Sequence, residues 1–207
     1  STAGIDETRE LLKLPVAESK AARMSFTENI FFIDSKTGNT LPEDLTILFF
    51  NNADTFTFQA PSREVDFSSG VICMPQNFQE NANRRDLVEV RATHLANFDL
   101  WNTVSKDRKA YESLKAEKRH ESSLVVEQFL GRFEHDIVYQ DSFSPVTIKR
   151  FTGKIDGAIY GSPEKTANGY IGFENLFIAG TDQGFLGIIG SMLSGVSIVN
   201  QNILTKL

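Results

Sequence analysis

Short apolar, β-prone runs separated by turn residues dominate the first half of the chain, and in two of them, 55–59 and 87–94, apolar and polar residues alternate. Between residues 25 and 70 turn-forming residues separate such β-prone runs, which lie at 29–33, 45–50 and 55–59. Further runs lie at 70–74 and 87–94. Alternation with a period of two is typical of a strand with one buried face and one wet face. We therefore expect an antiparallel sheet of at least four strands.

A helical spacing replaces this alternation after residue 105. Apolar residues recur at steps of three and four between residues 105 and 135, which predicts one long helix or two in tandem. The charged run at 106–120 is interpreted as the solvated face of that helix. A short helix is predicted at 5–14, ended by Pro15, and a short strand at 137–140.

The C-terminal part has the order apolar run, glycine-rich turn, helix. The run 176–179 has no polar residue, which is typical of a strand covered on both faces in a parallel sheet. Gly180, Gly184, Gly187 and Gly190 follow, and 191–204 is a helix candidate with small residues that would let it lie close on a sheet. The N-terminus of such a helix offers unpaired N–H groups and a partial positive charge. A phosphate, or a cofactor ring that gains negative charge, would be stabilised there.

The same C-terminal stretch has a second interpretation. No charge occurs between residues 183 and 205, and this length could span a membrane as a helix. The polar residues Gln183, Asn200, Gln201 and Asn202 within it, and the lack of flanking Trp or Tyr, favour a buried helix of a soluble protein instead.

Composition narrows the classes of function. The 207 residues allow one large domain or two small ones, and 27 acidic against 21 basic residues leave no dense basic run for a nucleic acid or an anionic membrane surface. A single cysteine, Cys73, excludes an internal disulfide and a CxxC motif. His94, His120 and His135 lack metal-ligand spacing, so no metal site is expected. No constellation of catalytic side chains is visible, and the catalytic residues stay unknown.

Three segments resemble one family. Asn175-Leu-Phe-Ile-Ala-Gly-Thr-Asp182, with Gly187-Ile-Ile-Gly190 and Gly195, resembles the C-terminal flavin-binding segment of FAD-dependent phytoene desaturases, carotenoid isomerases and all-trans-retinol 13,14-reductases (retinol saturases). Arg150-Phe-Thr-Gly153 and the segment 157–161 resemble the family pattern RYTG…GxxYG. Ser1-Thr-Ala-Gly4 resembles the stretch that leaves the nucleotide domain. The resemblance is strong over 147–200 and faint between 14 and 147.

The resemblance implies an α+β fold in two parts. Residues 1–172 would form a substrate-binding domain with a mixed or antiparallel sheet and helices, its first 14 residues being a connection from the FAD domain. Residues 173–207 would be a C-terminal strand, turn and helix of an FAD-binding Rossmann-like domain. By analogy, Asp182 would hydrogen-bond the ribityl or phosphate region of FAD, and the backbone of Gly187, Ile188 and Ile189 would face the flavin ring. Gly180 and Gly190 would permit close approach.

One departure from the family limits what the chain is expected to do alone. The dinucleotide fingerprint GxGxxG after a first strand is absent, as is the proline that the desaturases carry in the glycine-rich turn. We therefore expect the C-terminal portion of an FAD-dependent oxidoreductase that acts on carbon–carbon bonds of an apolar polyene, a carotenoid or retinoid-like molecule. FAD would be held in the full-length parent, and the isolated chain would be inactive and without FAD.

The expected partners are an apolar small-molecule substrate and the N-terminal dinucleotide-binding portion of the parent. No nucleic acid is expected, the location is expected to be cytoplasmic, and a peripheral membrane contact is left open. The alternative is a non-catalytic binding domain for an apolar ligand or partner, and a weaker one is a domain anchored in a membrane by residues 183–205.

Overall fold

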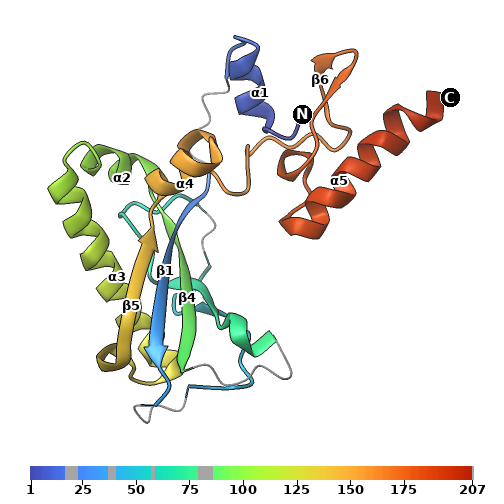
Figure 1. Cartoon of the computed structure of the whole chain (residues 1–207). Helices are drawn as coiled ribbons and strands as arrows, with labels where there is room; N and C mark the ends of the chain where they lie inside the picture. Colours follow the sequence, from blue (N-terminus) through green and yellow to red (C-terminus); the bar gives the residue numbers. More distant parts are fainter. Residues whose placement is uncertain (17–22, 37–40, 57–58, 79–85, 207) are drawn as a thin grey trace. The chain divides into compact units, whose positions relative to one another are not determined.

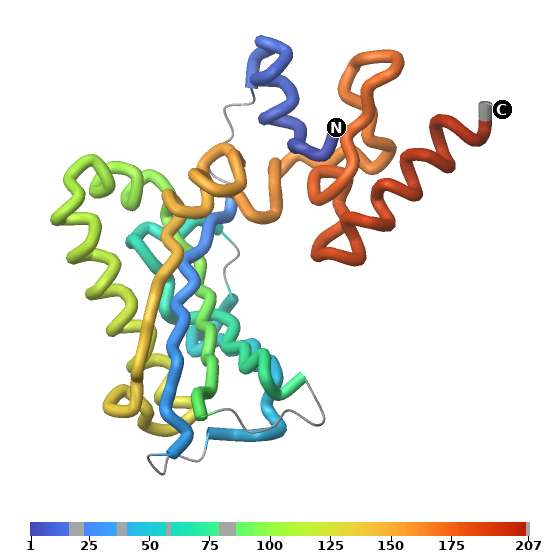
Figure 2. The backbone as a smooth tube through the Cα atoms, in the orientation of Figure 1, coloured from blue at the N-terminus to red at the C-terminus, as the bar shows by residue number. Residues whose placement is uncertain are grey.

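The computed structural model describes residues 1–16, 23–36, 41–56, 59–78 and 86–206. The chain forms two compact units, one of Ser1–Ser25 with Ile148–Leu207 and one of Phe26–Thr147 (Figures 1 and 2). This division differs from the expected boundary at residue 172, because residues 148–172 pack with the C-terminal segment and with described residues among 1–16 and 23–25. We call the two parts the terminal unit and the central unit and describe each by itself.

The central unit is built on a five-stranded antiparallel sheet with the strand order β2-β3-β4-β1-β5. The strands are β1 (Ser25–Asp34), β2 (Ile47–Asn51), β3 (Ser69–Cys73), β4 (Leu87–Ala96) and β5 (Ile137–Phe143). Two helices in tandem, α2 (Phe98–Val104) and α3 (Arg108–Leu130), lie between β4 and β5 in the sequence. The fold is therefore mixed α+β, and the expected antiparallel sheet is confirmed. The predicted helical region 105–135 contains the single long helix α3, whereas α2 lies before that region and was not predicted.

Helix α3 starts and stops where local chemistry requires. The Asp107 side chain accepts hydrogen bonds from the backbone N–H groups of Lys109 and Ala110, which satisfies two donors that the first turn leaves open. Gly131 follows the helix with a φ of 82°, a conformation that costs other residues more. These two residues fix the length of the helix that covers the sheet.

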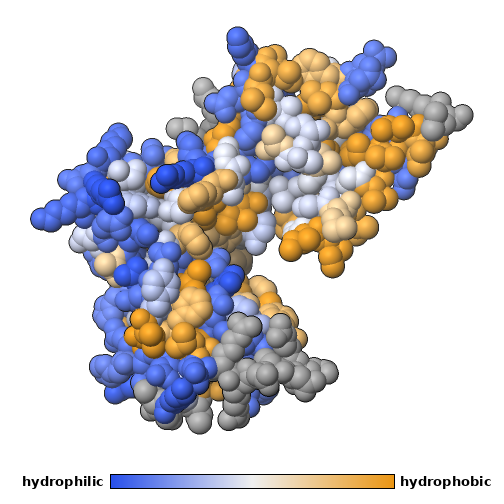
Figure 3. Space-filling view, viewed as in Figure 1, coloured by the Kyte–Doolittle hydropathy of each residue, from blue (hydrophilic) through white to orange (hydrophobic). Residues whose placement is uncertain are grey.

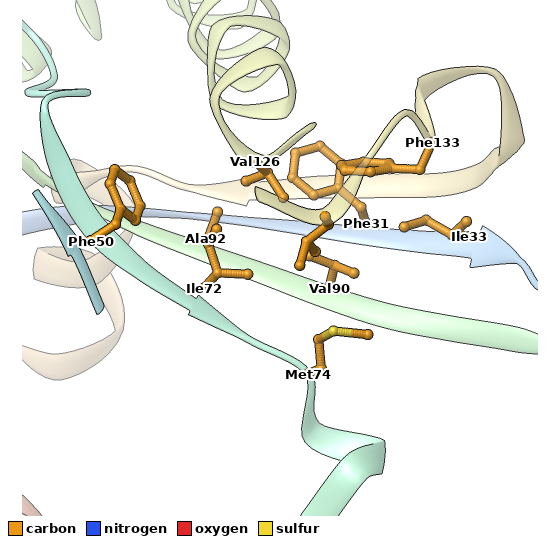
Figure 4. Packing of buried hydrophobic residues seen from close by; sticks show 10 residues of the cluster. Phe31, Ile33, Phe50, Ile72, Met74, Val90, Ala92, Val126 and Phe133 are labelled. Atoms are coloured by element: carbon orange, nitrogen blue, oxygen red, sulfur yellow. The ribbon is translucent and has the colours of Figure 1, made fainter. Parts of the chain in front are cut away.

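The core of the central unit lies between one face of the sheet and α3. Burial alternates along all ten residues of β1, so that Phe31 and Ile33 face inward. Figure 4 shows Val126 and Phe133 on the same side of the sheet as Phe31, and all three belong to one buried cluster with Val90 of β4. Each such fully buried side chain contributes about 1.5–3 kcal/mol through the area it removes from water. The sheet and helix thus form a self-contained apolar layer.

The terminal unit contains shorter elements. Its helices are α1 (Ile5–Leu11), the end of α4 (Pro145–Thr152) and α5 (Gly187–Asn202), and its two strands are β6 (Tyr170–Phe173) and β7 (Leu176–Phe177). Single 3-10 turns occur at η4 (Ile155–Gly157), η5 (Thr181–Gln183) and η6 (Leu204–Lys206), and in the central unit at η2 (Pro75–Phe78) and η3 (Glu134–Asp136).

Two expectations for the first part of the chain need correction. The sequence predicts a strand at 55–59, but Thr55, Phe56 and Gln59 are not in a strand, and residues 57 and 58 lie outside the described residues. The predicted helix 5–14 ends at Leu11, and Lys13 follows with a φ of 57°.

The run 176–179 is not a strand covered on both faces in a parallel sheet. β7 has only two residues, both half-buried, and pairs antiparallel with β6 in a two-stranded sheet. The run is apolar for a different reason: Ile178 is fully buried beside Gly169 and Ile198, which the close packing around Gly169 brings together.

Across the described ranges of the chain, no helix is both long enough and apolar enough to cross a membrane. The charge-free stretch 183–205 begins as a turn, and α5 takes up only Gly187–Asn202 of it.

Candidate functional site

The candidate site is the glycine-rich turn that leads into α5. The φ angles of Gly180, Gly184 and Gly187 are 110°, 104° and 74°, which are values that side chains other than glycine rarely adopt. A Cβ at any of the three would meet no atom of the described chain within 4 Å, so the turn geometry and not crowding requires glycine here. Gly190 differs, since its Cβ would meet the Phe185 backbone carbon at 3.2 Å.

The first turn of α5 presents its backbone to the surroundings. Leu186 precedes the helix and makes no side-chain capping bond within the described chain. The next residues, Ile188 and Ile189, are 84% and 75% exposed. The first N–H groups of a helix have no partner within it, and they carry a partial positive charge of roughly half a unit. The position is therefore suited to an acceptor or an anionic group.

An open hollow of about 590 Å³ lies beside this turn. Tyr160, Thr181, Gly187, Ser191 and Met192 are among the residues that line it. Thr181 and Ser191 supply hydroxyl groups, whereas Tyr160 and Met192 supply apolar surface. The hollow thus combines a few polar atoms with apolar walls next to the helix N-terminus, which is a common composition for a small-molecule site.

Asp182 lies behind the turn and does not face the hollow. Its side chain is fully buried, and its oxygens accept hydrogen bonds from the backbone N–H of Ile5 at 2.5 Å and of Ser162 at 2.8 Å. The Lys165 ammonium lies 3.8 Å from the same carboxylate. In this arrangement Asp182 positions the loop by joining three segments of the terminal unit. The expected bond to the ribityl or phosphate region stays a prediction, and it would require Asp182 to give up an internal partner.

Two glycines leave room for the Asp182 carboxylate. A Cβ on Gly161 would lie 1.7 Å from Asp182 Oδ1, and a Cβ on Gly4 would lie 2.9 Å from Asp182 Oδ2. Both glycines also have positive φ angles. Gly4 and Gly161 therefore leave the space that the buried Asp182 carboxylate occupies, a role that the sequence did not indicate.

A serine on α5 ties the helix to the turn. The Ser194 hydroxyl accepts a hydrogen bond from the Gly180 backbone N–H at 2.5 Å and donates to the side-chain carbonyl of Gln183. The Gln183 amide in turn donates to the Ala167 carbonyl at 2.6 Å. Ser194 is fully buried, so this part of α5 lies close to the glycine-rich turn. That the small residues bring the helix close to a sheet stays a prediction.

The first residue runs beside the segment that leads into the turn. The Ser1 amino group donates to the Phe177 carbonyl at 2.5 Å, and the Ala179 N–H donates to the Ser1 carbonyl at 2.9 Å. Hydrogen bonds from one residue to both sides of another are the pattern of parallel pairing. Ser1 therefore forms one parallel pair with the segment 177–179, on the side of β7 opposite to β6.

A buried ion group holds the start of α1 to the η4 turn. Arg23 lies 2.9 Å from Asp6 and 3.0 Å from Asp156, and the side chains of Arg23 and Asp6 are almost fully buried. Burial opposes the charge on Arg23, but the bonds to the two carboxylates outweigh it and raise the pKa of the guanidinium. Glu7 continues the group, accepting from the Ile155 N–H at 2.8 Å and lying 3.7 Å from Lys154 Nζ. This group could not be predicted from the sequence, because residue types alone do not indicate that Arg23 lies next to a carboxylate as far away as Asp156.

His94 is buried in the central unit and hydrogen-bonds only to groups of the protein in the described structure. His94 is fully buried, with Nε2 2.9 Å from the Ser122 hydroxyl and Nδ1 3.3 Å from the Ser69 carbonyl. Burial lowers the pKa of His94 to about 4. A group that is inaccessible and weakly basic cannot serve as a general base at neutral pH. The described part of the chain holds no group of three potential metal ligands.

The outer face of α5 is apolar and exposed. We call this outer face the apolar face of α5, formed by Ile188, Ile189, Met192, Leu193, Val196 and Val199, which are 41–84% exposed. Figure 3 shows apolar residues along the helix. Contiguous exposed apolar patches are often sites of interaction with another molecule.

Comparison with known proteins finds no matching family model and no matching curated relative.

Proposed function

We propose that the chain is the C-terminal part of an FAD-dependent oxidoreductase that acts on carbon–carbon bonds of an apolar polyene. The observation that carries the proposal is the uncapped N-terminus of α5, which follows a turn of three positive-φ glycines and lies beside an open hollow. The resemblance of residues 175–195 to the flavin-binding segment of desaturases and retinol saturases supports the same assignment.

The residues present fit the ring end of a flavin. The backbone N–H groups of Gly187, Ile188 and Ile189 would face the ring edge, where the helix dipole favours the negative charge of the reduced form. The open space at the missing Cβ of Gly187 would let a flat ring approach the backbone. A bound flavin would supply hydride transfer to or from the substrate carbon.

The chain's own residues would then have supporting roles. Asp182 and Ser194 would keep the turn in place through their bonds to Ile5, Ser162 and Gly180. Tyr160 and Met192 would keep water from the hollow. No residue is assigned as a proton donor or acceptor.

In this proposal β7 and α5 are a βα unit of a Rossmann-like domain. The single parallel pair between Ser1 and residues 177–179 supports it, since such domains are built from parallel strands. The partner that would cover the apolar face of α5 is the N-terminal dinucleotide-binding portion of the parent. The isolated chain would then bind no FAD and show no activity.

A charge change at the turn tests the flavin assignment. Ile188→Glu in the full-length parent would place a negative charge at the helix N-terminus, where it stabilises the helix but repels an anionic ring edge or phosphate. Ile188→Gln is the matched control with the same shape and no charge. We expect purified Ile188→Glu to lose most of the yellow flavin absorbance and Ile188→Gln to keep it. Equal flavin content in the two variants would contradict the proposal.

The alternative is a non-catalytic domain that binds an apolar ligand or partner. The exposed apolar face of α5 favours it as a second candidate, because such a face can serve a partner protein without any redox chemistry. A parent that purifies without flavin, and whose upstream sequence lacks a strand-GxGxxG-helix segment, would favour this alternative.

A further inference from the structure

The face of the central sheet that points away from α3 is a mixed apolar and charged surface. On β2, β3 and β4 the residues Phe49, Val71 and Thr93 lie side by side, and the next row along these strands is Ile47, Cys73 and Arg91. Phe49 and Ile47 are 75% and 42% exposed. These residues alternate with Phe50, Ile72 and Ala92, which face the core, so this set lies on the opposite face.

The other side of the same face is also partly apolar. Phe32 on β1 is paired with Tyr139 on β5, and their ring centres are 5.9 Å apart. Tyr139 is 58% exposed. Figure 3 shows hydrophobic and hydrophilic residues next to one another on the surface of this unit.

Three charged side chains lie within this apolar surface. Arg91 Nε lies 2.5 Å from Glu89 Oε1, and Arg91 Nη1 lies 3.8 Å from Glu28 Oε1. One guanidinium thus serves two carboxylates, and the group has a net charge of about −1. Asp141 on β5 has its own cation, because Lys115 Nζ lies 3.9 Å from its carboxylate. The surplus charge therefore resides on the carboxylate with the longer contact, that of Glu28.

Glu28 is the group that a covering ligand would affect most. Burial raises the pKa of Glu28, and the opposing effect of Arg91 is smaller. The contact with Arg91 therefore does not fully offset the hydration that the ionised carboxylate has lost. An apolar chain laid over the neighbouring strands would remove more water from this carboxylate. Only a cation would replace the lost hydration and balance the charge.

We propose that this sheet face binds a small amphiphile with an apolar chain and a cationic amine head. The ammonium group lies against Glu28 and Glu89, and the chain lies over Cys73, Val71, Ile47 and Phe49. The distance from β4 to β2 is roughly 10 Å, twice the spacing between strands, and an octyl chain covers it. A carboxylate head adds to the negative surplus, and a hydroxyl head leaves it unbalanced. The proposal concerns the central unit alone and does not depend on flavin binding.

The test is displacement of the neutral dye Nile red from the purified chain by octylammonium, octanol and octanoate at pH 7. We expect octylammonium to displace the dye at a concentration roughly fivefold lower than octanol, which corresponds to one partly exposed ion pair, and octanoate to be the weakest. Equal displacement by the three compounds, or a preference for octanoate, would overturn the proposal.

Three variants locate the effect. Glu28→Gln removes the charge with little change of shape and is expected to abolish the preference for octylammonium over octanol. Glu112→Gln, an exposed acid on α3, makes the same charge change elsewhere and should keep the preference. Phe49 is 75% exposed and so not needed for folding. Phe49→Ser should lower the affinity for all three compounds by a similar factor. A preference that survives Glu28→Gln, or disappears with Glu112→Gln, would show that net charge and not this face selects the head group.

Discussion

The central unit and the terminal unit are each stabilised internally by a different kind of interaction. In the central unit, fifteen hydrophobic and eight polar or charged residues are buried among those the structure describes. In the described part of the terminal unit, five hydrophobic and eight polar or charged residues are buried, including Asp6, Arg23 and Asp182. The central unit therefore depends on burial of apolar area, and the terminal unit depends on hydrogen bonds to buried charges.

This difference bears on what each unit can do alone. Apolar burial is non-directional and leaves the open face of the central sheet tolerant of change. The terminal unit instead holds its chain segments by specific bonds, and the apolar face of α5 is exposed. We therefore expect the central unit to respond most to changes of apolar volume and the terminal unit to changes of hydrogen-bonding groups.

The largest effect is expected from the core of the central unit. Phe31→Ala removes a fully buried ring that packs against Phe133 with ring centres 5.7 Å apart. The lost burial and the cavity should lower the free energy of unfolding by about 4 kcal/mol, measured by urea denaturation. Phe49→Ala removes the same side chain from an exposed position of the same sheet and serves as control. A loss below about 1 kcal/mol for Phe31→Ala would contradict an apolar basis for this unit.

A smaller but more local effect is expected at the polar centre of the terminal unit. Asp182→Asn replaces one of the two acceptor oxygens by an NH2 group, which then opposes the N–H of Ile5 or that of Ser162, while the remaining oxygen can still accept from the other. We expect a loss of about 3 kcal/mol, since a buried charged partner is removed. Hydrogen exchange should show faster exchange at these two amides while the amides of β1 and β4 stay protected. Uniform loss of protection in both units would show that they are not separately stabilised.

The buried histidine gives the central unit a dependence on pH. His94 has a folded pKa of about 4 against 6.5 in the unfolded chain, so the unfolded state binds more protons between these values. Stability should be highest above pH 6.5 and fall by about 2–3 kcal/mol as the pH decreases to 4. His94→Gln should have a lower stability at pH 7 and lack most of this decrease, as measured by denaturation at several pH values. An unchanged slope in the variant would assign the decrease to other groups.

The smallest effect is expected on the apolar face of α5. Ile188→Ser, at a residue 84% exposed, should change the free energy of unfolding by less than about 0.5 kcal/mol, whereas Ile198→Ser, at a residue 7% exposed, should cost about 2–4 kcal/mol. Denaturation curves of the two variants provide the comparison. A large cost at Ile188 would mean that this face is already covered, for example by a second copy of the chain.

The β-prone runs bounded by turn residues predicted most of the central sheet. The runs 29–33, 70–74 and 87–94 lie within or nearly within β1, β3 and β4. The run 55–59 alternates most regularly, yet its described residues are not in a strand. Alternation over five residues therefore does not by itself indicate a strand, because pairing with a neighbouring strand is also needed.

The candidate site was predictable only in part. The position of the glycine turn and of the helix that follows could be read from residue types, since positive-φ turns need glycine and the next run is apolar. The roles of Asp182 and Arg23 could not, because their partners lie as far away in the sequence as Ile5 and Asp156. A charged residue in a sequence does not indicate whether its partner is a ligand, a side chain or a backbone amide.

The close contact between Gly161 and Asp182 has a consequence for the evolution of the chain. Any larger residue at position 161 would collide with the carboxylate, and an apolar residue at 182 would leave the amides of Ile5 and Ser162 without their acceptor. The two positions should therefore covary across homologous sequences, either both retained or both replaced. Gly4 should follow them, which would make the first residues of the chain change in step with a loop more than 150 positions away.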